Sequence, residues 1–112
     1  MKVQHYECTA AEPAEDIPGL SVRWVISEED GAPNFAMRVF DVASGAASPF
    51  HQHPWEHEVF ILQGKGAVKG ATGETPFEAG YVVYVKPDEQ HQFVNKGDDI
   101  LRFICLIPHL KK

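Results

Sequence analysis

Short runs of β-prone, mostly apolar residues recur along the chain, and turn-forming residues separate them. Each run is short enough to be a strand, and Gly, Pro, Asn or Asp occupies the intervals between runs. The predicted strands span residues 20–26, 35–42, 58–62, 67–70, 81–85, 91–95 and 100–107. No long segment has convincing helical periodicity. Because closure removes exposed strand edges, this pattern predicts an all-β fold: a sandwich, a jelly roll or a closed barrel.

One predicted strand is apolar at successive positions rather than at alternate ones. Residues 59–62 read Val-Phe-Ile-Leu, so both faces of this strand are expected to be buried. One face would lie in the core and the other against a second sheet or a second subunit. The pattern therefore favours a homodimer.

The length and composition indicate one globular domain. The chain has 112 residues, 44% of them hydrophobic, and we predict a single domain over 1–112, with an N-terminal strand and loop at 1–19 and the barrel core at 20–107. The net charge of −6 disfavours nucleic acid and anionic membranes as partners. Without an export-like start or a long apolar run, a cytoplasmic location is expected, with Cys8 and Cys105 as free thiols.

Histidines cluster in one short stretch of the sequence. His51, His53 and His57 lie within seven residues, and His91 begins a later predicted strand. Alternate residues of a strand share a face, so the first two imidazoles should converge. Pro54 ends or turns the strand, which lets the third return to the same point. Solvated histidines around a turn are the alternative, but the spacing favours a site for one divalent transition-metal ion.

The stretch from Gly45 resembles the first conserved motif of the cupin family. That motif has a glycine, five residues, His-x-His, three or four residues, and a glutamate. Gly45, His51 and His53 match it. The motif ends with a further glycine about seven residues after the glutamate, and here that glycine is displaced by one position, to Gly64 or Gly66.

A second stretch resembles the other cupin motif, in which a glycine is followed by Pro-x-Gly, a histidine and an asparagine. Gly80, His91 and Asn95 match at the family's spacing. Pro87 stands one position late, and Glu89 occupies the region of the motif's glycine. The resemblance implies a single double-stranded β-helix, the jelly-roll barrel of the cupins, with one metal ion inside.

The remaining ligand is a choice between neighbours, because both His57 and Glu58 obey the family's spacing. Adjacent residues of a strand point to opposite faces, so only one of them can face the metal. The block His-x-His-Pro-Trp-Glu-His-Glu resembles a subgroup of very small bacterial cupins that bind manganese or a similar ion through four histidines. The resemblance therefore implies His57. The ion would be manganese first, with iron, nickel, copper or zinc as alternatives.

The chemistry of such a site depends on its open coordination positions. Four imidazoles around an octahedral ion leave two positions for water, dioxygen or a bidentate oxygen ligand, whereas a tetrahedral zinc ion would be closed and structural. We expect apolar residues at the barrel mouth to favour a small, partly apolar or aromatic ligand. The residues expected there are Phe60, Phe93, Phe103 and Ile104.

Three functions follow from the resemblance. The first is a metal-dependent enzyme acting on a small organic molecule, with dioxygenase-type chemistry ahead of isomerisation or cyclisation. The second is a non-catalytic cupin that binds a small ligand, and the third is a structural metal site. Glu58 and Cys105 are the candidate catalytic residues.

Overall fold

The computed structural model describes residues 1–109, which form strands and two single-turn 3-10 helices. No helix in this part of the chain is long and apolar enough to cross a membrane. The predicted single domain includes residues 110–112, which lie outside the described residues. In chain order the elements are η1 (Tyr6–Cys8), β1 (Glu12–Pro13), β2 (Leu20–Ile26), η2 (Glu28–Asp30), β3 (Phe35–Val42), β4 (His57–Gln63), β5 (Lys65–Gly70), β6 (Gly73–Glu78), β7 (Val82–Val85), β8 (Gln92–Asn95) and β9 (Leu101–Pro108).

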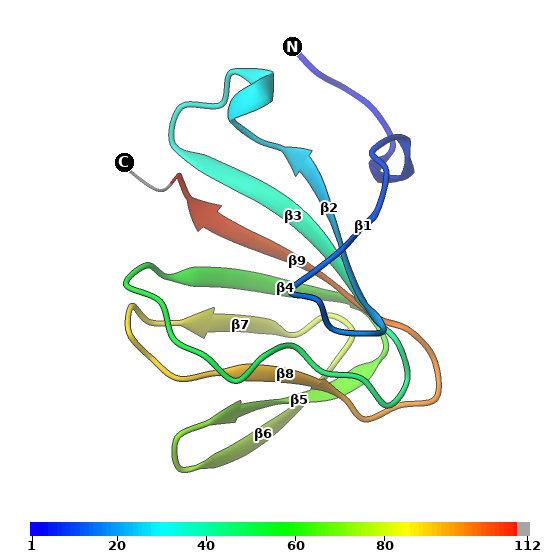
Figure 1. Cartoon of the computed structure of the whole chain (residues 1–112), viewed down its shortest axis with the longest axis vertical. Coiled ribbons are helices and arrows are strands. Elements are labelled where there is room, and N and C mark those ends of the chain that lie inside the picture. Colours follow the sequence, from blue (N-terminus) through cyan, green and yellow to red (C-terminus); the bar gives the residue numbers. More distant parts are fainter. Residues whose placement is uncertain (110–112) are drawn as a thin grey trace.

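Two antiparallel sheets build the jelly roll, as the strand pattern predicted (Figure 1). The larger sheet has the order β1-β2-β3-β9-β4-β7, and the smaller sheet has the order β6-β5-β8. The C-terminal strand β9 lies in the middle of the larger sheet, where it pairs with β3 on one side and β4 on the other. All seven predicted strands are present, with ends that shift by one or two residues.

An irregular segment extends the smaller sheet alongside β8. Ala47 bridges Val94 and His51 bridges His91, so residues 46–51 run antiparallel to this strand without forming a regular strand. Figure 1 shows this green trace passing beside β8 before the chain enters β4. This pairing joins the two stretches of sequence that contain the histidines.

The strand β6 was not predicted. β6 pairs with β5 as the edge strand of the smaller sheet, and it contains Pro76. A proline lacks the N–H that a central strand needs but is tolerated at an edge. Glu12 and Pro13 form the two-residue strand β1 within the segment 1–19, for which a strand and a loop were predicted.

The space between the sheets is filled by apolar side chains at one end. Phe103 of β9 stacks on Phe40 of β3 with ring centroids 5.3 Å apart, and on Phe93 of β8 at 4.9 Å. Phe77 of β6 continues the row, 6.2 Å from Phe93. These four rings, here called the aromatic floor, cross the interior from one sheet to the other. His91 stands next to this floor, with its ring 6.2 Å from that of Phe93.

Two glycines, one just before β5 and one within it, are required by close backbone approaches. Gly64 has φ +94°, and a Cβ there would lie 2.8 Å from the carbonyl oxygen of Ile100. At Gly66 a Cβ would lie 2.4 Å from the carbonyl oxygen of Val94. Because both contacts are with backbone atoms, neither position accepts a side chain without a shift of the sheet.

Candidate metal centre

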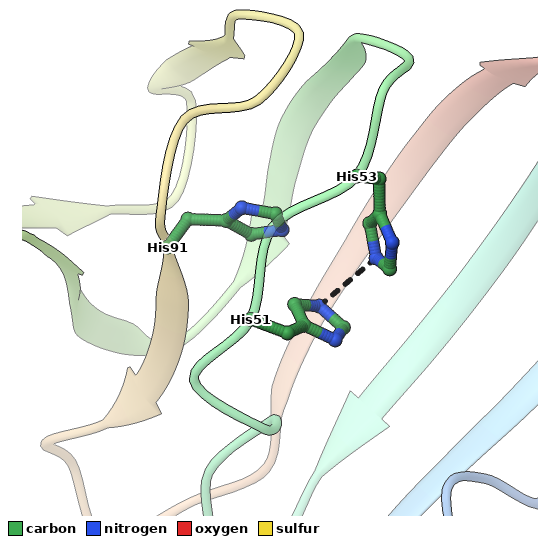
Figure 2. Close-up of side chains that lie close together, drawn as sticks. All are labelled: His51, His53 and His91. Atoms are coloured by element: carbon green, nitrogen blue, oxygen red, sulfur yellow. Dashed lines mark hydrogen bonds between the residues drawn. The ribbon is translucent and has the colours of Figure 1, made fainter.

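Three of the four predicted histidines meet inside the barrel. One ring nitrogen from each of His51, His53 and His91 lies within 4.8 Å of the others. Figure 2 shows the three rings turned toward one another, and the Nε2 atoms of His51 and His53 are 3.3 Å apart. The predicted convergence of these side chains on one point is therefore present.

The backbone holds these histidines in place differently from the prediction. His51 and His91 exchange two backbone hydrogen bonds, with N···O distances of 3.1 and 2.9 Å. His53, however, lies beyond this bridge and outside any strand. His51 and His53 therefore do not share a regular strand. The His53 carbonyl accepts a hydrogen bond from the Asp88 N–H at 2.6 Å, which joins it to the turn before β8.

That turn also explains a departure from the cupin motif. Asp88 has φ +66°, the left-handed conformation that a glycine adopts most easily. The left-handed residue of this turn is thus Asp88, directly before Glu89 in the region of the motif's glycine. Aspartate is among the few other residues that adopt this conformation.

His57 begins β4 and points into the barrel beside the other three. Its ring centroid lies 4.8 Å from that of His91 and 5.3 Å from that of His53, and the residue is 6% exposed. Its Nδ1 atom contacts the Cys105 Sγ atom at 3.3 Å, and its Nε2 atom is buried without a hydrogen-bond partner. His57 is outside the group whose ligand atoms all lie within 4.8 Å, although its ring adjoins them.

Strand parity in β4 places the neighbours of His57 outside. His57, Val59 and Ile61 are buried, whereas Glu58 and Phe60 are exposed on the opposite face. Glu58, Phe60 and Ile104 line a groove on the outside of the larger sheet. The expectation that Phe60 and Ile104 line the barrel mouth was therefore wrong, while Phe93 and Phe103 belong to the aromatic floor.

A cysteine and an arginine adjoin the histidines on the larger sheet. Cys105 is buried, and its Sγ atom accepts a hydrogen bond from the Arg38 guanidinium at 3.1 Å. Burial raises the pKa of the Cys105 thiol, an effect that Arg38 partly opposes. Cys8 lies near the other end of the sequence and is exposed, and both cysteines are free, as predicted.

Burial keeps the imidazoles neutral. It lowers the pKa of His51 to about 4 and that of His57 to about 3, and neighbouring imidazoles and Arg38 lower both further. The pKa of His53 is lowered by burial as well, although the exposed carboxylate of Glu15 opposes the shift. Neutral imidazole is the form that binds metal ions, so these rings need lose no proton at neutral pH.

The hydrogen bonds of His91 and His57 involve Nδ1 and leave the Nε2 atom of each ring free. The Nδ1 atom of His91 lies 2.9 Å from the Glu89 carbonyl oxygen, which only accepts, so this Nδ1 atom carries the proton and Nε2 keeps its lone pair. In His57 the bond to Cys105 likewise involves Nδ1 and leaves Nε2 unpaired. A buried, unpaired imidazole nitrogen in a histidine cluster is what a metal ligand requires. The residues present thus fit a divalent transition-metal ion.

Unpaired buried polar side-chain atoms are concentrated at this site. Within the part of the chain that the structure describes there are three such atoms: Nε of Arg38, Nε1 of Trp55 and Nε2 of His57. Trp55 stacks its ring on His53 with centroids 4.3 Å apart, and Arg38 contacts Cys105. Because buried polar groups are normally paired, their grouping beside the histidines marks this end of the interior as a ligand site.

Other residues considered from the sequence lie elsewhere or have structural roles. Asn95 donates hydrogen bonds to the carbonyls of Val42 and Asp99 and supports the loop before β9. His5 caps η1, and His109 contacts the Ala32 carbonyl, so neither joins the cluster.

The sequence analysis did not identify Arg38 as a residue of the site, although the alternation of side chains in β3 indicates that it faces inward. Arg38 alternates with Ala36, Phe40 and Val42, three side chains that pack in or against the core. A cation at an inward position of an otherwise apolar strand face is unusual and often functional.

A jelly roll with histidines from two paired segments at one end of its interior defines the class of small β-barrel proteins whose interior side chains could hold a metal ion. Residues 38–107 match the cupin domain family, and the chain belongs to that family.

Similar proteins include both enzymes and a binding protein. The structure of the polyketide cyclase RemF from Streptomyces resistomycificus superposes with a TM-score of 0.90 at 27% identity, over 96% of this chain and 79% of that one. A predicted oxalate decarboxylase from Thermotoga maritima has a TM-score of 0.83 at 23% identity, covering 97% of this chain and 100% of its own. An oxalate-binding protein from Thermotoga maritima is 31% identical over 64 residues, which are 56% of this chain and 53% of that relative. The match thus spans about half the length of this relative.

Proposed function

We propose that this cupin holds one divalent transition-metal ion through His51, His53, His57 and His91 and acts on a small oxygen-bearing organic molecule there. The observation that carries the proposal is the convergence of ring nitrogens from paired segments distant in sequence, with the buried Nε2 of His57 unpaired beside them. Manganese is the first candidate, with iron, nickel, copper or zinc as alternatives.

Strand parity supports His57 over Glu58 as the fourth ligand. His57 is inside the barrel near His91, whereas the Glu58 side chain is on the outer face of the same strand. Four neutral imidazoles leave the charge of a divalent ion uncompensated. When bound, such an ion supplies a Lewis acid that polarises a carbonyl or enol oxygen.

The reaction class we favour is isomerisation or cyclisation of a small carbonyl compound. It is supported by the likeness to the polyketide cyclase RemF, and it requires no redox change at the metal. Dioxygenase-type chemistry, which the sequence placed first, becomes the second candidate, and it is supported by the open coordination positions that the cluster would leave on an octahedral ion. Cys105, which contacts His57, is the candidate for a proton-holding group at the site. Glu58 lies outside the interior and is the weaker candidate.

We further propose that a second copy of the chain covers the outer face of the larger sheet. Phe60, Val82 and Tyr84 are 45%, 74% and 57% exposed on the neighbouring strands β4 and β7. With Ile104 and Leu106 of β9 they line an apolar groove of about 400 Å³. A solvated face of an antiparallel sheet is normally polar, so this face is expected to be buried in a dimer.

Metal analysis of matched variants tests the ligand set. Purified protein loaded with Mn²⁺ and dialysed should retain one ion per chain in elemental analysis. The His57→Ala variant should bind the ion at least about tenfold more weakly, because a direct ligand is lost, while Glu58→Ala should match the wild type.

The control for misfolding is His51→Ala, which removes a ligand from a less buried position. It should also weaken metal binding while its circular dichroism spectrum stays that of the wild type. Full metal occupancy in His57→Ala together with an empty site in Glu58→Ala would show that the ligand choice is wrong. Wild-type protein that retains no ion would refute the proposed function altogether.

A further inference from the structure

Arg38 is a cation in the barrel interior whose surroundings differ from those of the other arginines. It lies opposite Cys105 of β9 and Trp24 of β2 in the strand register. Its guanidinium carbon is 4.8 Å from the ring centroid of Phe40 and 5.3 Å from that of Trp24. Two aromatic rings therefore fix the plane of the guanidinium group beside the histidine cluster.

Within residues 1–109 no carboxylate forms an ion pair with this cation. By contrast, Arg102, also half-buried, binds both carboxylate oxygens of Asp41 at 2.7 and 3.0 Å. The single hydrogen-bond partner of Arg38 among these residues is the Cys105 sulfur, a weak acceptor, and its Nε atom is buried and unpaired.

The same sulfur atom places Arg38 next to the candidate metal ligands. Cys105 Sγ contacts the Arg38 guanidinium at 3.1 Å and the His57 Nδ1 atom at 3.3 Å. The interior thus combines neutral imidazoles with an unpaired cation that has only donors. A partly desolvated cation of this kind favours an anionic acceptor, and a guanidinium group matches a carboxylate in shape and charge.

We propose that Arg38 anchors the carboxylate of the small molecule that binds at the histidine cluster. The substrate class is then a small organic acid whose second oxygen group faces the histidines and whose body packs against Trp24 and Phe40. This inference deepens the proposed function and rests on it for the role of the second oxygen group. The recognition of the carboxylate by Arg38 itself does not require the metal.

Benzoate and benzamide form a matched pair of probes, because they differ in charge but hardly in size. Isothermal titration calorimetry of the Mn²⁺-loaded and metal-free wild type should show tighter binding of benzoate than of benzamide. Arg38→Gln should weaken benzoate binding about ten- to one-hundredfold and change benzamide binding by less than about twofold. Arg38→Lys should fall between the two, because it keeps the charge without the guanidinium fork.

Arg23→Gln is the control variant. Arg23 donates to the Thr9 carbonyl and lies over the Tyr6 ring, away from the histidines. Equal losses in the Arg23 and Arg38 variants would overturn the proposal, as would equal weakening of benzoate and benzamide or no binding of benzoate by the wild type. Thermal unfolding checks that each variant is folded, and Arg38→Met, which keeps the apolar stem, repeats the test if the Gln variant is not.

The two proposals fail in distinguishable ways. Absence of a retained ion together with an Arg38-dependent preference for benzoate in metal-free protein supports the carboxylate anchor and refutes the metal centre. A retained ion together with benzoate binding that is unchanged by the Arg38 substitutions supports the metal centre and refutes the carboxylate anchor.

Discussion

Three of the four clustered histidines each contact one specific neighbour that orients the ring. The Glu89 carbonyl fixes the proton of His91 on Nδ1, the Cys105 thiol contacts Nδ1 of His57, and Trp55 stacks on the ring of His53. Such contacts orient an imidazole before a ligand arrives. The polypeptide thus orients these three rings through its own contacts.

The lowered pKa values predict how the metal-free protein responds to acid. An unfolded histidine titrates near pH 6.5, whereas burial lowers the pKa of His51 to about 4 and that of His57 to about 3. Between these values the unfolded chain binds more protons than the folded one, so stability falls as the pH falls. Urea unfolding in the presence of a chelator should show full stability above about pH 7 and a progressive loss from about pH 6.5 downward.

The histidine contribution to stability is best measured between about pH 7 and pH 5, because carboxylates titrate below this range. The His57→Asn variant removes the most strongly shifted imidazole and should have a shallower pH dependence there than the wild type. Identical slopes for the two proteins would contradict this assignment.

Residue identity alone predicted much of the site but not its cation. Spacing and the two motifs predicted that His51, His53 and His91 meet at one point, although His51 and His53 do not share a regular strand. Arg38 lies in a different strand and contacts the cluster only through Cys105. A contact between side chains that are 67 residues apart in the sequence depends on strand order, which the apolar pattern does not specify.

Among the elements, β8 and the loop that follows it depend on one buried amide. Asn95 is 5% exposed, donates to the carbonyls of Val42 and Asp99, and accepts from the Gly97 N–H. It therefore ties the end of β8 to β3 and to the turn before β9. This is the backbone role expected for the asparagine of the second cupin motif.

Asn95→Ala should destabilise the protein by about 2–3 kcal/mol, because several buried backbone groups lose their partner. Denaturant unfolding measures this change, and Mn²⁺ affinity should not change, since Asn95 contacts no histidine of the cluster. Asn34→Ala, at an exposed position, is the control and should stay within about 0.5 kcal/mol of the wild type. An unchanged unfolding midpoint in Asn95→Ala would contradict the role described.

At the scale of elements, the sequence predicted strands better than it predicted their faces. β4 is apolar on both faces, so alternation could not show that His57, Val59 and Ile61 are inside and Phe60 outside. β6 was missed because Pro76 and neighbouring polar residues weaken the strand signal, and only its position at a sheet edge permits them. In both cases the missing information was the position of the strand in the sheet.

For the molecule as a whole, the proposed dimer is the property most open to test. Light scattering after size exclusion should give twice the chain mass for the wild type. Phe60→Glu should give a monomer, because a buried, unpaired charge in the interface costs several kcal/mol.

Phe35→Glu is the matched control, since Phe35 is also an exposed aromatic residue of the larger sheet but lies outside the groove. It should leave the wild-type mass unchanged. A wild type that remains monomeric at all concentrations would refute the dimer.

The aromatic floor closes one side of the barrel interior to a ligand. The stacked rings of Phe40, Phe103, Phe93 and Phe77 fill the interior on one side of the histidines, together with the buried side chains of Val42, Ile61 and Leu101. These side chains close the interior on that side of the histidines. A product held at the histidines would occupy the position that the next substrate needs, so the product of any reaction here should act as a competitive inhibitor.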